Sequence, residues 1–233
     1  MRTEVDDAKQ QVRERIWNVL DAAAAALDQT TNGRIPNSKG SRAAADRLAT
    51  LTVPDKAQLA VRAKALDEAK TVYMAVPKLA DPRPFYLLDP AALTIPPAEA
   101  ASSKVAATIA PRVDVSELQP VDMVVVGSVA VNRAGIRIGK GAGYSDLEFA
   151  FLMEAELLSE RTIVVTTVHS LQVVDEELPA TEHDFGVDLI VTPEEVITCP
   201  APHRPSGLVW EHLDAAKTAS IPVLAARAPA GDS

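Results

Sequence analysis

Glycines and cations are concentrated in one short stretch, Gly135 to Asp146, which reads GIRIGKGAGYSD. Five of the chain's ten glycines lie between positions 127 and 143. Glycine loses much conformational entropy on folding, so a cluster of this kind needs a purpose, such as close approach of the backbone to a ligand. Backbone N–H groups that no Cβ atom shields, next to Arg137 and Lys140, suit a phosphate group. The stretch therefore favours anion binding.

The residues after this loop predict a helix that would complete such a site. Asp146 to Glu160 is apolar nearly all round, which indicates a buried helix, and a helix N-terminus attracts anions. Ser145 and Glu148, three residues apart, predict a capping box at its start. Asp146 then has two open roles: a carboxylate that stabilises the helix dipole, or a ligand for a phosphate-bound Mg²⁺.

Two familiar phosphate-binding templates do not fit the loop. The Walker A loop needs four residues between its first glycine and Gly-Lys-Ser/Thr, but only three separate Gly135 from Gly139. The dinucleotide fingerprint needs G-x-G-x-x-G, whereas the glycines from Gly139 to Gly143 follow G-x-G-x-G. A tight strand-to-helix turn without a ligand therefore remains the alternative.

The surrounding elements indicate an α/β chain in which strands and helices alternate. A parallel sheet would place the loop at the carboxyl edge of its strands, where ligands bind. VDMVVVGSV reads as a central parallel strand, because it is continuously apolar. FYLL at 85–88 reads as an edge strand. The other predicted strands are 71–77, 162–169, 187–192 and 221–226, and the other predicted helices are 4–27, 43–51, 54–70, 102–110 and 207–219.

Composition narrows the class of protein. The chain has 233 residues, enough for one large domain, and 47% of them are hydrophobic. A net charge of −9 argues against non-specific nucleic-acid binding. The single cysteine, Cys199, cannot form an internal disulfide, and neither a signal peptide nor a bilayer-spanning run is evident. We expect a cytoplasmic protein without a membrane partner, with one domain over 1–228 and a frayed tail at 229–233.

The loop resembles the nucleotide-loop signature of the 5-formyltetrahydrofolate cyclo-ligase family, also called methenyltetrahydrofolate synthetases. That signature has a hydrophobic strand, a Gly-x-Arg-x-Gly turn and a Gly-x-Gly-Tyr-Tyr-Asp-Arg run. Seven residues align with it without a gap: Gly135, Arg137, Gly139, Gly141, Gly143, Tyr144 and Asp146. GRIPNSKG and VYMAVPKL look more like a divergent branch of the family, the methenyltetrahydrofolate synthetase domain-containing proteins.

Two further segments carry the resemblance. Lys9 and Arg13, four apart on one predicted helix face, match a Lys and an Arg that reach the nucleotide phosphates in the family; a solvated charged face is the alternative. Downstream, a strand–loop–strand pattern matches, which we interpret as structural, with His183 as an orienting or packing residue. The matching positions there are Gln172, Leu178-Pro179, His183-Asp184, Asp188 and Thr192.

The resemblance implies a three-layer α/β/α fold with a mostly parallel sheet, of the type shared with sugar-phosphate isomerases and CoA transferases. It also implies an ATP- and Mg²⁺-dependent ligase of folate one-carbon metabolism. The formyl oxygen of 5-formyltetrahydrofolate is phosphorylated, the neighbouring nitrogen attacks, and phosphate leaves to give 5,10-methenyltetrahydrofolate. The implied catalytic residues are Arg137 and Lys140, the implied metal ligand is Asp146, and the implied ATP-binding residues are Lys9, Arg13, Gly139, Lys140, Gly141, Gly143, Tyr144 and Asp146.

Two departures from the signature leave alternatives open. Ser145 stands where the family has a second Tyr, and Leu147 where it has an Arg. An Arg offers a fixed charge and several donors that Leu147 lacks. Either Lys140 supplies that charge and the protein is a ligase, or the chain is a non-catalytic nucleotide- or folate-binding module. A sugar-phosphate or CoA-ester enzyme of the same fold is a further alternative. The folate pocket and the oligomeric state stay unassigned.

Overall fold

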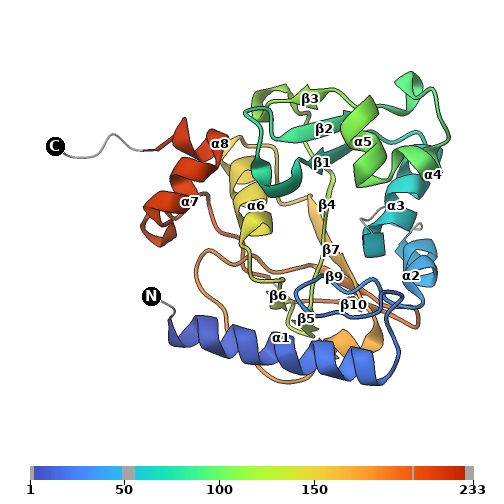
Figure 1. Cartoon of the computed structure of the whole chain (residues 1–233), viewed down its shortest axis with the longest axis vertical. Coiled ribbons are helices and arrows are strands. Elements are labelled where there is room, and N and C mark those ends of the chain that lie inside the picture. The colour runs from blue at the N-terminus through green and yellow to red at the C-terminus, as the bar shows by residue number, and fades with distance from the viewer. Residues whose placement is uncertain (1–2, 49–55, 201, 229–233) are drawn as a thin grey trace.

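The computed structural model describes residues 3–48, 56–200 and 202–228 (Figure 1). The predicted tail (229–233), the end of the predicted helix 43–51 and the start of the predicted helix 54–70 lie outside these ranges. The elements are α1 (Glu4–Ala22), α2 (Ser41–Leu48), α3 (Lys56–Asp67), β1 (Val72–Ala75), η1 (Pro77–Leu79), β2 (Phe85–Leu88), η2 (Pro90–Ala92), α4 (Pro97–Ala100), α5 (Ser103–Ile109), β3 (Arg112–Val113), η3 (Val115–Glu117), β4 (Met123–Val126), β5 (Ala130–Asn132), β6 (Arg137–Ile138), α6 (Tyr144–Glu154), β7 (Ile163–Thr167), η4 (Ser170–Gln172), β8 (Val173–Val174), β9 (Leu189–Val191), β10 (Val196–Thr198), η5 (Trp210–His212), α7 (Ala215–Ser220) and α8 (Pro222–Ala225).

A four-stranded sheet of order β10-β9-β7-β4 forms from the β-branched runs of the sequence. β4, β7 and β9 are parallel, with Val124 opposite Val164 and Val165 opposite Leu189, and β10 returns antiparallel to β9. Strands rich in valine suit such burial on both faces. β4 is the outer strand of this sheet, so the prediction that it is central was wrong.

Helices cover both faces of the four-stranded sheet. Successive strand residues point to opposite faces, and Val164 and Val165 show this directly. Val164 belongs to one hydrophobic cluster with Phe149 and Phe151 of α6, whereas Val165 belongs to another with Leu48 of α2. This sandwich places α6, and hence the end of the glycine loop, against one face of the sheet.

Two smaller sheets complete a mixed α/β fold. β1, β2 and β3 are antiparallel in that order, so FYLL is a middle strand and its prediction as an edge strand was wrong. β5 pairs antiparallel with β6 and parallel with β8. The predicted α/β class is confirmed, but within the described residues the sheet is mostly parallel only in the four-stranded part.

Helix α1 packs on the β5–β6 hairpin through Ile16, Trp17 and Leu20. It ends at Ala22, five residues before the predicted end at Leu27. The alanine run there favours a helix, but Ala24 adopts a left-handed φ of 48° and the backbone pairs instead with residues 37–39. In Figure 1 α1 lies along one side of the molecule, away from α7 and α8.

The C-terminal segment differs most from its prediction. The predicted helix 207–219 is divided into η5 and α7, because the side chain of Asp214 accepts a hydrogen bond from Lys217 N and caps a new helix. The predicted strand IPVLAA is the short helix α8, with Pro222 at its first position. Both helices lie beside α6 (Figure 1). Among the described helices, none is both long and apolar enough to cross a membrane.

Candidate anion-binding site

The glycine loop, residues 139–143, joins β6 to α6. The sequence suggested that the loop follows β4 directly, but the β5–β6 hairpin lies between β4 and the loop. Gly141 and Gly143 have φ of +97° and +68°, a conformation that favours glycine. Gly143 is the N-cap of α6 and the helix starts at Tyr144. The predicted capping box of Ser145 and Glu148 is therefore wrong, since Ser145 lies inside the first turn.

A cationic side chain stands at each glycine of the loop, where a Cβ atom would be. A Cβ on Gly139 would lie 3.2 Å from Nη1 of Arg137, and one on Gly141 would lie 3.1 Å from Cζ of Arg13. A Cβ on Gly143 would lie 2.8 Å from Nζ of Lys217. The absence of a side chain at these three glycines thus lets three cations approach the loop backbone. The chain carries a net negative charge, yet it concentrates positive charge here.

Helix α1 delivers Arg13 and Lys9 to the loop. Both lie on the helix face that Trp17 anchors, and they are 9% and 7% exposed. The Nε–H of Arg13 donates to the carbonyl of Gly139 at 2.8 Å. Lys9 forms an ion pair with Asp184, from the loop before β9. A solvated charged face is therefore ruled out for these two residues.

Asp184 is kept ionised by its partners. Burial alone would raise the pKa of its carboxyl group, but hydrogen bonds from Lys9 and Thr181 outweigh that effect and hold the pKa below its ordinary value. The Thr181 hydroxyl donates at 2.7 Å and its backbone N–H at 2.6 Å. Asp184 thus fixes the Lys9 ammonium beside the loop.

Arg137 holds Asp146 at the start of α6. Its Nη2 donates to Oδ1 of Asp146 at 2.8 Å, and its guanidinium lies 4.1 Å from the ring centroid of Phe185. Phe185 stacks in turn on Phe149, with centroids 4.2 Å apart. The Arg137 side chain is only 3% exposed, against 21% for Asp146. Asp146 is consequently the member of the pair that a ligand can reach.

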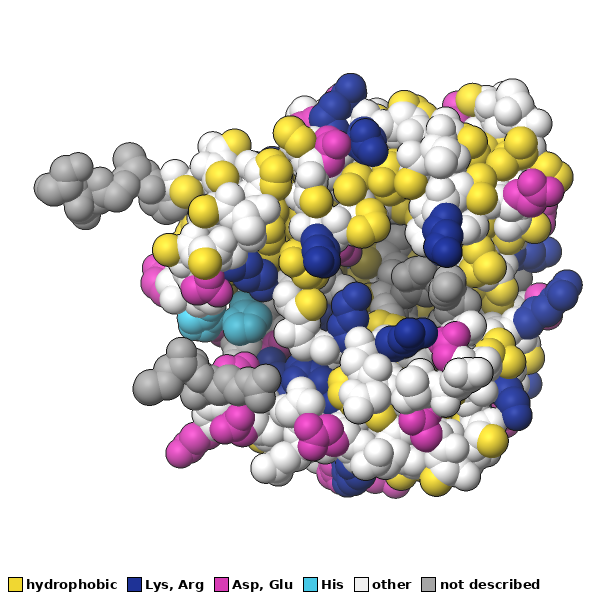
Figure 2. All heavy atoms as spheres, in the orientation of Figure 1, with side chains coloured by type: hydrophobic (Ala, Val, Ile, Leu, Met, Phe, Trp, Pro, Cys, Tyr) yellow, Lys and Arg dark blue, Asp and Glu magenta, His cyan; other side chains and the backbone are white. Residues whose placement is uncertain are grey.

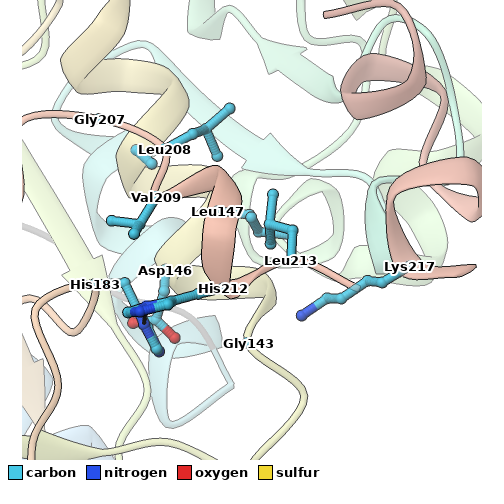
Figure 3. Close-up of a pocket in the computed structure, with 11 residues that line it drawn as sticks. Gly143, Asp146, Leu147, His183, Gly207, Leu208, Val209, His212, Leu213 and Lys217 are labelled. Carbon is cyan, nitrogen blue, oxygen red and sulfur yellow. Dashed lines mark hydrogen bonds between the residues drawn. The ribbon is translucent and has the colours of Figure 1, made fainter. Parts of the chain in front are cut away.

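A pocket opens beside Asp146 between α6 and the segment 207–217 (Figure 3). Its apolar lining comes from Leu147, Ala150, Leu208, Val209 and Leu213. Its polar lining comes from Asp146, His183, His212 and Lys217. Figure 3 shows Asp146, His183 and His212 side by side, whereas Lys217 extends from α7 toward the loop at Gly143. On the face drawn in Figure 2, lysine and arginine side chains gather across the middle of the molecule.

The two histidines contact each other directly. Nδ1 of His183 lies 2.7 Å from Nδ1 of His212, and Nε2 of His212 lies 3.4 Å from Oε1 of Glu182. A hydrogen bond between two Nδ1 atoms needs one donor and one acceptor. The two histidines therefore cannot both be in the charged imidazolium form while this bond is present. Burial lowers the pKa of His183 below its ordinary value. The lowered pKa favours the neutral imidazole, and the packing or orienting role of His183 stays a prediction.

Residues 5–193 match the 5-formyltetrahydrofolate cyclo-ligase family. The chain belongs to this family. A methenyltetrahydrofolate synthase domain-containing protein of Mus musculus is 36% identical over 239 residues, which cover 96% of this chain and 64% of the mouse protein. The Homo sapiens protein of the same description is 36% identical over 233 residues, covering 93% and 60%. The chain thus spans a little under two thirds of the length of these relatives.

A solved structure supports the same fold for this member of the family. The NMR structure of Aquifex aeolicus 5,10-methenyltetrahydrofolate synthetase superposes with a TM-score of 0.50 at 20% identity. The superposition covers 84% of this chain and 93% of the bacterial one. At this identity the likeness concerns the fold alone.

The family's loop residues occupy different positions relative to the pocket. Gly143 and Asp146 line it, whereas Tyr144 is half-buried next to the Lys217 ammonium, which is 5.6 Å from the ring centroid. Lys140 is exposed, and within the described residues its side chain forms no hydrogen bond or ion pair. Leu147 is 5% exposed and belongs to the main hydrophobic cluster, so it is a core residue of α6.

Sequence reasoning missed three contributors to the site. Phe185 supports Arg137, and His212 and Lys217 line the pocket. His212 and Lys217 lie beyond residue 193, where the family match ends. No periodic signal marks them, because their position depends on the break at Asp214 and on the docking of α7 against α6. Asp184, by contrast, was part of the sequence pattern already noted.

Proposed function

We propose that this chain binds ATP and Mg²⁺ at the glycine loop and cyclises 5-formyltetrahydrofolate to 5,10-methenyltetrahydrofolate. The observation that carries the proposal is the set of cations against Gly139, Gly141 and Gly143 in a member of the cyclo-ligase family. A cradle of this kind suits the phosphates of a nucleotide, since the three glycines let cationic side chains gather against the loop backbone. We also propose, on the same family membership, a three-layer arrangement like that of sugar-phosphate isomerases and CoA transferases.

The residues would divide the work as follows. Arg13 would hold the loop through Gly139 and add its positive charge beside the phosphates. Lys9, positioned by Asp184, would add a second charge from α1. Gly141, Gly143 and Tyr144 would shape the cradle. When bound, ATP would supply the phosphoryl group that activates the formyl oxygen. Chemistry of this type depends on positioning and charge neutralisation more than on a nucleophile.

Asp146 is the proposed Mg²⁺ ligand. Mg²⁺ commonly takes one or two carboxylates and completes its shell with phosphate oxygens and water. Arg137 bonds Oδ1 of Asp146, and a carboxylate has a second oxygen to offer. Within the described residues no cluster of three or more His, Cys, Asp or Glu side chains could hold a metal by itself, which fits a cation brought in with phosphate. We therefore assign Arg137 to positioning Asp146 and Lys140 to the charge on the exposed side of the loop.

One assay tests the proposal. The purified protein is incubated with 5-formyltetrahydrofolate, ATP and Mg²⁺, and the methenyl chromophore is followed by absorbance. We expect turnover in the parent, a large loss in Lys140→Ala and no change in Lys104→Ala, which removes an exposed lysine of α5. Absence of product with intact ATP binding would leave a non-catalytic nucleotide-binding module, the reading that the uncharged Leu147 favours. Absence of both would point to a sugar-phosphate or CoA-ester enzyme.

A further inference from the structure

Lys217 is a cation that the fold directs at the glycine loop from the C-terminal segment. Asp214 caps α7 by accepting from Lys217 N, which fixes where the helix starts. The Lys217 Nζ donates to the carbonyl of Ala142 at 3.1 Å, 75 residues away in sequence. Its ammonium also lies 5.6 Å from the centroid of the Tyr144 ring. Lys217 therefore holds the loop at Ala142, whereas Arg13 holds it at Gly139.

The charge of Lys217 lacks a carboxylate partner in the described part of the chain. No Asp or Glu there lies within 4.0 Å of its ammonium, although Lys9 and Arg137 each have one. An ammonium group has three N–H donors, and the Ala142 carbonyl takes one. Two donors thus remain for other acceptors, and Lys217 lines the same pocket as Asp146. A half-buried cation with spare donors is suited to an anionic ligand.

Helix α6 supplies no cationic side chain to the glycine loop at Leu147, where the family signature has an Arg. Leu147, one turn into α6, is buried in the core and has no charge to offer the loop. Lys140 is exposed and is not among the residues that line the pocket. Gly143 leaves room for the ammonium, since a Cβ there would lie 2.8 Å from Nζ. The space beside Gly143 is therefore occupied by a cation from residue 217, which lies outside the residues 5–193 that match the family.

We propose that Lys217 is a phosphate-binding residue of this site. That the phosphate belongs to a nucleotide rests on the proposed function, whereas binding of a phosphate by the Lys217 ammonium does not. Its ammonium would bind a phosphate oxygen of the ligand held over Gly143, while Asp146 would hold the accompanying Mg²⁺. The C-terminal segment thereby becomes part of the ligand site and not a structural extension alone.

The test measures binding, so that it does not depend on turnover. Calorimetry with inorganic tripolyphosphate, and separately with ATP and Mg²⁺, compares the parent with Lys217→Met, Lys217→Arg and the control Lys104→Met. Loss of a charge-assisted hydrogen bond predicts about 10- to 100-fold weaker binding in Lys217→Met. Lys217→Arg should stay within several-fold of the parent, and Lys104→Met should be unchanged. A thermal melt checks that each variant is folded.

A second measurement uses the unmutated protein and so does not require the variant to fold. Acylation of lysines by an amine-reactive ester is followed by peptide mass spectrometry; tripolyphosphate should slow the reaction of Lys217 at least several-fold and leave Lys104 unchanged. Equal tripolyphosphate affinity in parent and Lys217→Met, or no protection, would overturn the proposal, as would absence of tripolyphosphate binding to the parent. Protected, tight binding without methenyl product would uphold Lys217 and overturn the ligase function.

Discussion

The ion pair between Lys9 and Asp184 gives the sharpest stability prediction. The two side chains are 9% and 17% exposed, and the pair joins α1 to the loop before β9. Removing one partner of a buried pair costs about 3–5 kcal/mol, while an exposed pair contributes about 0–1 kcal/mol. Because the pair is partly exposed, we expect Lys9→Met to lower the free energy of unfolding by an amount between these limits, roughly 2 kcal/mol. For a chain of this size that is a fall in Tm of about 4–8 °C.

A double-mutant cycle isolates the interaction. Lys9→Met, Asp184→Asn and the double variant are unfolded in urea, and the coupling energy is expected at about 1–3 kcal/mol. The matched control is Arg15 with Glu176, also an ion pair from α1 but 48% and 44% exposed, for which we expect less than about 1 kcal/mol. A coupling energy for Lys9 and Asp184 no greater than that of the control would refute the reasoning.

The pH dependence of the same pair provides an independent check. The pKa of Asp184 is lowered from its ordinary 3.8, so its contribution is fully present above that value and is lost as pH falls through the folded-state pKa. The stability difference between parent and Asp184→Asn should therefore persist at pH 5 and shrink below pH 3.8. A difference that stays constant down to acid unfolding would contradict this assignment.

Four further outcomes are expected. Gly143→Val should abolish tripolyphosphate binding in calorimetry and cost about 1–3 kcal/mol, because φ is +68° and the side chain would displace Lys217; retained binding would count against the cradle. Leu147→Arg should lower stability to urea by about 3 kcal/mol, since it places an unpaired charge in the core, and an unchanged midpoint would show that the site is open. Burial lowers the pKa of His183 from 6.5, so the parent should lose stability as pH falls below that value, and His183→Gln should lack that part of the loss; superimposable pH profiles would argue otherwise. Burial, with Asp188 nearby, raises the pKa of Cys199 to about 11, so iodoacetamide at pH 8 should leave the folded protein unmodified; rapid alkylation would mean that the thiol is accessible.

The sequence predicted correctly those strands and helices whose hydrophobic pattern matches the side chains that they bury. The valine runs of β4, β7 and β9 formed strands, and the predicted helix 4–27 formed over most of its length, with Ile16 and Leu20 buried. Gly141 lies next to Arg13, so α1 meets the loop, while the ATP-binding roles expected of these residues stay predictions. In these places periodicity, glycine content and charge all favour the same structure.

The errors arose where tertiary contacts overrode local preference. A short apolar run such as IPVLAA does not distinguish strand from helix, and Pro222 at its first position favoured the helix. FYLL formed a middle strand because β3, only two residues long, pairs with it from 112–113. The capping box failed because Gly143, with a positive φ, starts α6 one residue before Ser145. Lys217 could not be predicted, since its place depends on how α7 docks.

The two side-chain hydrogen bonds on the loop carbonyls also bear on how the molecule folds. Arg13 reaches Gly139 across 126 positions of sequence, and Lys217 reaches Ala142 across 75. Contacts of such long range form only after extensive loop closure, which slows folding and delays these contacts relative to local ones. During synthesis the loop emerges well before α7. The site is therefore assembled only when both α1 and α7 have docked against the loop. Binding of tripolyphosphate would then report the completion of folding, and hydrogen exchange of the loop amides should be among the last to become protected.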